Sequence, residues 1–200
     1  MNACVNDPVL SVHTLLHSRR TTLPKRLLGP GPDAAQRQLI LEAASAAPDH
    51  DQLLPWRFIE LPEAARAPLG EAFAQALRAR DPRASVEEQA QAREKAQRAP
   101  WLLVLVVRTG GAPADIPASE RLLSAGAAVQ NMLLMCSALG LGSGLTSGKA
   151  LHSAPLRALL QLGQEEEAIC FVNVGHVGTS RQPRARPEVA RYFSVLGAPD

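Results

Sequence analysis

The sequence predicts an α+β fold, because its helical and strand segments are mixed without the regular βαβ alternation of a doubly wound sheet. Residues 101–107 form a run that is apolar on both faces, which is typical of a strand in the centre of a sheet. Residues 169–177 predict a second central strand, and residues 119–139 predict the longest helix. We therefore expect a mixed central sheet flanked by helices.

The length and composition fit one globular domain spanning residues 1–200. The 46% of hydrophobic and 20% of charged residues exclude disordered and fibrous classes. A formal net charge of +2 and an aromatic content of 4% do not indicate a nucleic-acid partner. The cysteines, Cys4, Cys136 and Cys170, lack the spacing of a zinc site. Without a signal peptide or a long apolar stretch, we expect a cytoplasmic protein with no membrane partner.

The first sixty or so residues predict two helices, a polar segment and a strand. Asp7 followed by Pro8 is typical of a helix start, and Asp33 is placed to cap a second helix that Pro48 stops. The segment up to Pro55 is too polar for regular structure. The predicted elements are helices at 8–20 and 34–47, an irregular segment at 48–55 and a strand at 56–61.

The middle of the chain predicts helices that cover the body of the domain. Residues 63–80 and 85–98 are rich in Ala, Glu, Gln and Arg, and Asp81 and Pro82 separate them. The apolar stripes of these helices are thin. We therefore expect the region 63–98 to be the most mobile part of the domain.

The second half of the chain centres on the helix at 119–139, which is apolar nearly all round. Such a helix is buried in a large core or in a subunit interface. Gly140 is placed for its C-terminal cap. After it we expect a glycine-rich crossing at 142–148, a short helix between Ser153 and Gly163, and a basic tail at 178–200.

The glycine-rich run that begins at Gly140 does not match three common motifs. A dinucleotide-binding fingerprint needs a strand before it, whereas a predicted helix precedes this run. A phosphate-binding P-loop needs glycine where Ser143 stands and Ser or Thr where Ala150 stands. The G-x-S-x-G turn of esterases does not occur in the chain.

Two positively charged segments are candidate phosphate sites. Arg19 and Arg20, followed by Thr21, offer bidentate donors and a short neutral donor. The alternative is that both arginines only complement the dipole at the end of the first helix. Near the C-terminus, Arg184 and Arg186 belong to a run of arginines that is either a phosphate clamp or a solvated basic tail.

Histidines provide two further candidates. His50 lies between Asp49 and Asp51, where a carboxylate can orient the ring and raise its pKa, and the alternative is a surface histidine without a role. His13 and His17 are four residues apart on one helix face, but no third ligand follows nearby. We therefore expect an exposed helical pair and no metal site.

Four segments, in order along the chain, resemble the FMN-dependent nitroreductase family, and especially its small single-domain members with a Pro-Asp-His loop. The resemblance covers most of the chain, and four matches at similar spacing are more specific than any one of them. The segments are Leu15-Leu16-His17-Ser18-Arg19-Arg20-Thr21; Ala47-Pro48-Asp49-His50 with Pro55-Trp56-Arg57-Phe58; Ser124 to Asn131 leading to Leu139-Gly140-Leu141-Gly142-Ser143-Gly144; and Val174-Gly175-His176-Val177-Gly178.

The resemblance implies a homodimer with FMN sites at its interface, in which each site mixes residues of both chains. It implies that the Arg-Arg-Thr stretch holds the phosphate and ribityl chain and that the Pro-Asp-His loop approaches the flavin ring. The implied reaction is ping-pong hydride transfer from NADH or NADPH to a small acceptor such as a nitroaromatic or quinone, without a catalytic residue. The implied cofactor-binding residues are Arg19, Arg20, Thr21, Ala46, His50, Leu145, Thr146, Ser147 and Arg184 or Arg186.

The chain departs from the family pattern at three places. Leu145-Thr146-Ser147-Gly148 replaces Trp-Arg-Ser-Gly, Ala46 replaces an arginine of close relatives, and Leu54 replaces the glutamine before Pro-Trp. Two cations are thereby lost, so we expect weak FMN occupancy after purification. Two alternatives stay open: a flavoprotein of the same fold with another reaction, such as reductive dehalogenation or flavin destruction, and a non-catalytic flavin-binding protein.

Overall fold

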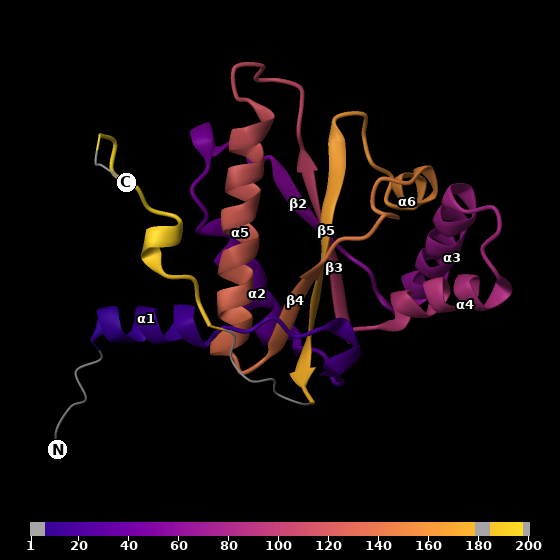
Figure 1. Cartoon of the computed structure of the whole chain (residues 1–200), viewed down its shortest axis with the longest axis horizontal. Coiled ribbons are helices and arrows are strands. Elements are labelled where there is room, and N and C mark those ends of the chain that lie inside the picture. The colour runs from indigo at the N-terminus through magenta and orange to yellow at the C-terminus, as the bar shows by residue number, and fades with distance from the viewer. Residues whose placement is uncertain (1–6, 179–184, 198–200) are drawn as a thin grey trace.

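The computed structural model describes residues 7–178 and 185–197, and it confirms the α+β class. A five-stranded sheet lies between two groups of helices (Figure 1). The helices are α1 (Pro8–Ser18), α2 (Ala34–Ser45), α3 (Glu63–Arg80), α4 (Val86–Glu94), α5 (Ala118–Ala138) and α6 (Ala154–Leu159), and the strands are β1 (Leu27–Leu28), β2 (Trp56–Glu60), β3 (Trp101–Arg108), β4 (Gly142–Thr146) and β5 (Glu166–Val177).

Every ladder of the sheet is antiparallel. β2 pairs with β3, with Trp56 opposite Val107, and β3 pairs in turn with β5. β5 also pairs with β4 and, at its C-terminal end, with β1. The sequence predicts a mixed sheet, but the five strands pair only in antiparallel fashion. Within the described residues, the parallel pairing is limited to one isolated bridge between Thr21 and Ser143.

The two faces of the sheet bury separate hydrophobic cores, because successive side chains of a strand point to opposite faces. Leu103 and Leu105 pack with α2 and α5, where Met132 is fully buried. Leu102 and Val104 pack with α3 and α6 on the opposite face. This double burial explains why the sequence of β3 is apolar on both faces.

Side-chain caps begin several helices at the positions that the sequence indicates. Asp7, Asp33 and Ser153 accept hydrogen bonds from first-turn amides of α1, α2 and α6. Ser85 does the same for α4 and forms a reciprocal capping box with Glu88. These contacts satisfy amides that a helix cannot pair internally, so local sequence determines where these helices start.

The helical cover predicted at 63–98 is present as α3 and α4, followed by a 3-10 turn at Lys95–Gln97. Leu69 of α3 is fully buried against the sheet. The buried guanidinium of Arg66 donates to the carbonyl oxygen of Ala96 at 2.9 Å, which ties α3 to the 3-10 turn. The mobility expected of this region stays a prediction.

The glycine-rich crossing expected at 142–148 is corrected by the structure, because residues Gly142–Thr146 form strand β4. Glycine has a low preference for strands, so the sequence pattern gives no strand signal. The strand forms because it pairs with β5. Glycine is needed where the strand packs closely against β1, because a Cβ on Gly142 would be 2.9 Å from Cδ2 of Leu27. The two-residue β1 and residues 166–168 of β5 also have no clear signal in the sequence.

Helix α1 contacts α5, but none of its residues is buried. Figure 1 shows α1 and the C-terminal segment extending beyond α5, on the side away from the sheet. α5 buries Met132 and Cys136 but leaves Leu123 exposed. Within residues 7–178 and 185–197, no helix combines the length and hydropathy needed to cross a membrane.

Candidate functional site

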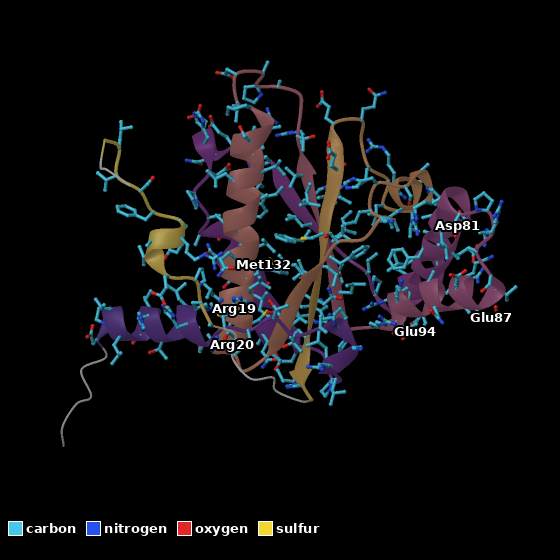
Figure 2. The ribbon with its side chains drawn as sticks, viewed as in Figure 1. Arg19, Arg20, Asp81, Glu87, Glu94 and Met132 are labelled. Carbon is cyan, nitrogen blue, oxygen red and sulfur yellow. The ribbon has the colours of Figure 1, made fainter. Side chains whose placement is uncertain are left out.

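An arginine cluster forms where α1 ends. The amide of Arg19 donates to the carbonyl oxygen of Leu15, and the guanidinium of Arg20 donates to the carbonyl oxygens of His17 and Arg19. The guanidinium of Arg20 thus satisfies carbonyls at the end of the helix, in keeping with the dipole role considered from the sequence, whereas Arg19 does so only through its backbone amide. Figure 2 shows the two arginines side by side near the lower end of α5.

A third cation, Arg186, joins this cluster from the C-terminal segment. Its Nη2 donates to the carbonyl oxygen of Arg19 at 3.0 Å. Burial, followed by the charges of Arg186 and Arg20, lowers the pKa of the Arg19 guanidinium. Among the described residues, no carboxylate forms an ion pair with any of the three. The cluster therefore carries uncompensated positive charge, which suits a dianion such as a phosphate ester.

The Arg-Arg-Thr segment is fixed to strand β4. Thr21 forms an isolated bridge with Ser143, and the amide of Thr22 donates to the carbonyl oxygen of Ser143 at 2.8 Å. Gly144 permits this approach, because a Cβ there would be 2.5 Å from the carbonyl oxygen of Thr22. Backbone contacts thus bring together two segments of the family resemblance: the Arg-Arg-Thr stretch and the glycine-rich run that forms β4.

The end of β4 presents the residues predicted after the glycine run. Leu145 and Ser147 are exposed, whereas Thr146 is half-buried. The buried side chain of Asn173 donates to the carbonyl oxygen of Gly144 at 3.1 Å and to the Thr146 hydroxyl at 3.0 Å. Sequence reasoning missed Asn173, although an amide inside an otherwise apolar strand is a signal for such a role.

His50 contacts a carboxylate that the sequence analysis did not select. Its Nδ1 lies 2.6 Å from Oε2 of Glu120 in the first turn of α5, and its Nε2 lies 3.8 Å from Asp51. The hydrogen bond with Glu120 is the main cause that raises the pKa of the His50 imidazole, and Asp51 adds to it. The histidine between two aspartates is therefore oriented by a residue 70 positions away in sequence.

Asp49 fastens the same loop to α5. One carboxylate oxygen accepts from the amide of Leu54 at 2.6 Å, and the other accepts from the hydroxyl of Ser124 at 3.3 Å. That hydroxyl in turn accepts from the indole Nε1 of Trp56 at 3.1 Å. The Pro-Asp-His loop and the strand after it are thereby held on one helix.

One chain does not bring the two halves of the nominated site together. Glu120 and the His50 loop lie at the start of α5, whereas the Thr21–Ser143 contact lies beyond its end. The 21 residues of α5 span about 31 Å at 1.5 Å per residue. Ala46 is exposed at the end of α2, and Arg184 lies outside the described residues.

The histidine pair on α1 agrees with the expected exposed pair. The rings of His13 and His17 stack with centroids 4.2 Å apart, and both residues are exposed. In the parts of the chain that the structure describes, no group of three or more His, Cys, Asp or Glu residues is arranged to hold a metal ion.

These features define the class of the protein first: an α+β protein with a cluster of arginines near the end of its long central helix. Residues 16–176 match the sequence model of the nitroreductase family. A Haemophilus influenzae protein named "Putative NAD(P)H nitroreductase" is 32% identical over 162 residues, which are 81% of this chain and 86% of that protein. The chain therefore belongs to the nitroreductase family, whose members are oxidoreductases.

Solved structures show the same fold at lower sequence identity. A nitroreductase-like family protein from Bacillus cereus has a TM-score of 0.79 and 17% identity, with 99% of this chain and all of that chain covered. A nitroreductase with bound FMN from Bacteroides fragilis has a TM-score of 0.68 and 18% identity, with 96% of this chain and all of that chain covered. The predicted nitroreductase-like fold is confirmed.

Proposed function

We propose that this protein is an FMN-dependent oxidoreductase that uses NADH or NADPH to reduce a small acceptor such as a nitroaromatic or a quinone. Its family and the FMN in the related Bacteroides fragilis structure support this function. The observation that carries the proposal is the uncompensated cluster of Arg19, Arg20 and Arg186 at the edge of the sheet.

The cluster fits the phosphate of FMN. Arg20 and Arg186 already donate to backbone carbonyls, so their guanidinium groups are held in place while further N–H donors stay free. The Thr21 hydroxyl adds a short donor beside them, and Arg184 is proposed to join from the tail. Fixed donors lose little entropy on binding, so this site is ready for a dianion.

The ribityl chain and ring would extend from this cluster along the end of β4. Leu145 offers an apolar contact, and Thr146 and Ser147 offer hydroxyl groups. Asn173 fixes the Thr146 hydroxyl as an acceptor, which leaves its proton free to point outward. When FMN is bound, it supplies the hydride-transfer chemistry, and the residues of the chain bind, orient and exclude water.

A homodimer completes the site. Val9 of α1, Leu123 of α5 and Phe193 of the C-terminal segment are 75%, 74% and 64% exposed, which leaves large apolar side chains for a second copy to cover. In a two-fold dimer with antiparallel α5 helices, the end of one helix lies beside the start of the other. The Arg19 cluster of one chain then meets the His50 loop of its partner, together with Ala46.

The phosphate assignment is tested with Arg19→Ala and the exposed, remote Arg80→Ala as its control. Each purified protein is incubated with FMN and passed through a desalting column. We expect the control to retain FMN as the wild type does and Arg19→Ala to lose nearly all of it. Equal retention by Arg19→Ala would overturn the assignment.

The dimer is tested by light scattering at micromolar protein concentration. We expect a mass near twice the chain mass of 21.3 kDa. A monomer that nonetheless retains FMN would contradict the shared site while leaving the flavin assignment intact.

A further inference from the structure

The loop around His50 is held in a strained shape. Asp51, Gln52 and Leu54 have positive φ values of 51°, 54° and 46°, a backbone region that residues other than glycine rarely adopt. The hydrogen bonds of Asp49 with Ser124 and Leu54 hold the loop in this strained backbone conformation. Strain that persists because surrounding contacts impose it is typical of functional loops.

The strained loop places the imidazole of His50 within hydrogen-bonding distance of Glu120. Nδ1 is 2.6 Å from Glu120, so this nitrogen is occupied and the ring orientation is fixed. Nε2 has only the more distant Asp51 at 3.8 Å, and the His50 side chain is half-exposed. Nε2 is therefore the nitrogen that can meet another molecule.

We propose that Glu120 is a positioning residue that makes His50 the proton donor for the acceptor reduced at this site. This inference rests on the proposed function and on the dimer that brings the His50 loop of one chain to the Arg19 cluster of the other. It adds a catalytic residue, His50, to a reaction for which the sequence nominated none.

Reduction of the acceptor needs one proton that the hydride does not supply, and His50 can donate it. Conversion of a quinone to a hydroquinone consumes two electrons and two protons. The hydride that originates on NADH or NADPH brings both electrons and one proton. The second proton comes from His50: its Nε2–H bond breaks, an O–H bond forms on the acceptor, and the neutral imidazole then takes a proton from water.

The charged groups around His50 favour its protonated form. Glu120 faces it from α5, Asp115 from the loop before α5, and Asp51 from its own turn, and all three are acids. Burial acts in the opposite direction, and the hydrogen bond with Glu120 outweighs it, so the pKa is raised. The buried guanidinium of Arg121 donates to the carbonyl oxygen of Gly110 at 3.0 Å and so helps to hold the loop that carries Asp115.

The first test needs no cofactor. The nitrogens of His50 are titrated by NMR in the flavin-free protein, in the wild type, in Glu120→Gln and in Glu87→Gln, a control on α4 at the far side of the molecule (Figure 2). We expect Glu120→Gln to lower the pKa of His50 toward the ordinary value of 6.5, and Glu87→Gln to leave it unchanged. An unchanged pKa of His50 in Glu120→Gln would overturn the positioning role.

The second test separates the two half-reactions by stopped flow in the FMN-loaded protein. Reoxidation by a quinone is expected to slow by roughly 10²-fold in His50→Gln, and by a larger factor than reduction of the same variant by NADPH. As the pH is raised, the reoxidation rate falls when His50 loses its proton. In Glu120→Gln this fall should occur at a lower pH than in the wild type, because the pKa of His50 is lower.

The outcomes distinguish the inference from the function on which it rests. If wild-type protein retains FMN and is reduced by NADPH, but His50→Gln and wild type are reoxidised at equal rates across pH, the proton-donor role is wrong and the function stands. If wild-type protein retains no FMN, the proposed function fails at its first step, and the proton-donor role fails with it.

Discussion

The amide of Thr22 donates a hydrogen bond to the carbonyl oxygen of Ser143 at 2.8 Å, across 121 positions of sequence. This contact attaches the segment that carries Arg19 and Arg20 to the edge strand β4. The proposed phosphate cluster therefore depends on the backbone geometry of β4, and not only on its own arginines.

Gly144→Ala should break this attachment. The new Cβ would lie 2.5 Å from the carbonyl oxygen of Thr22 and 3.3 Å from Cγ2 of Thr21, both of which are held by the strand contact. We expect a loss of about 1–3 kcal/mol in the free energy of unfolding, as is usual for overpacking, together with reduced FMN retention. Denaturant unfolding and desalting after FMN incubation measure the two effects.

The matched control is Gly148→Ala, because a Cβ at Gly148 has no neighbour within 4 Å. It should change neither stability nor FMN retention by a comparable amount. If Gly144→Ala behaves like this control, the attachment of the arginine segment to β4 is not what positions the cluster.

Ser124→Ala should loosen the His50 loop. The buried hydroxyl accepts from Trp56 and donates to Asp49, so its removal leaves the indole N–H and one carboxylate oxygen of Asp49 without this partner, while the other oxygen keeps the amide of Leu54. We expect a cost of about 1–3 kcal/mol in the free energy of unfolding and faster proteolysis within residues 48–55. Ser119→Ala, an exposed change on the same helix, is the control, and equal stability of the two variants would refute the prediction.

Acid should destabilise the protein through Glu166. Hydrogen bonds from Nε and Nη2 of Arg57, at 2.7 and 3.0 Å, are the main cause that lowers the pKa of Glu166 from 4.5 to about 2. A lowered pKa in the folded state means that the contribution is fully present above pH 4.5 and is lost as the pH falls toward 2.

Glu166→Gln should therefore be less stable than the wild type at pH 7 and should lose less stability on acidification. The difference is expected to be modest, because the side chains of Arg57 and Glu166 are 47% and 23% exposed. Glu42→Gln, which removes a surface carboxylate of α2, is the control. Parallel stability curves for wild type and Glu166→Gln between pH 2 and 5 would contradict this account.

Local signals in the sequence predict much of the fold. Caps such as Asp33 and Ser153 act within one turn, and the double-faced apolar pattern of β3 follows from burial on both sides. The pattern fails at β4, because Gly142 and Gly144 have no strand preference and are needed for close backbone approach to other segments. Such a requirement is visible only after the chain has folded.

The candidate site, too, is predictable from sequence where it depends on adjacent residues and not where it depends on contacts between distant ones. The Arg-Arg-Thr and Pro-Asp-His segments are recognisable in sequence, because their chemistry is carried by adjacent residues. Glu120 and Asn173 are not, because their roles depend on contacts with residues far along the chain: Glu120 with His50, and Asn173 with Thr146. An isolated acid in a first helical turn is usually a dipole contact, so its sequence context gives no reason to select it.

The central claim, that this chain is a flavin-dependent oxidoreductase, is tested most directly by an anaerobic visible spectrum of the FMN-loaded, desalted protein. We expect an oxidised flavin band that bleaches when NADPH or NADH is added and returns when a quinone or nitroaromatic follows. Absence of any flavin band after loading, or a band that neither nicotinamide donor bleaches, would contradict the claim.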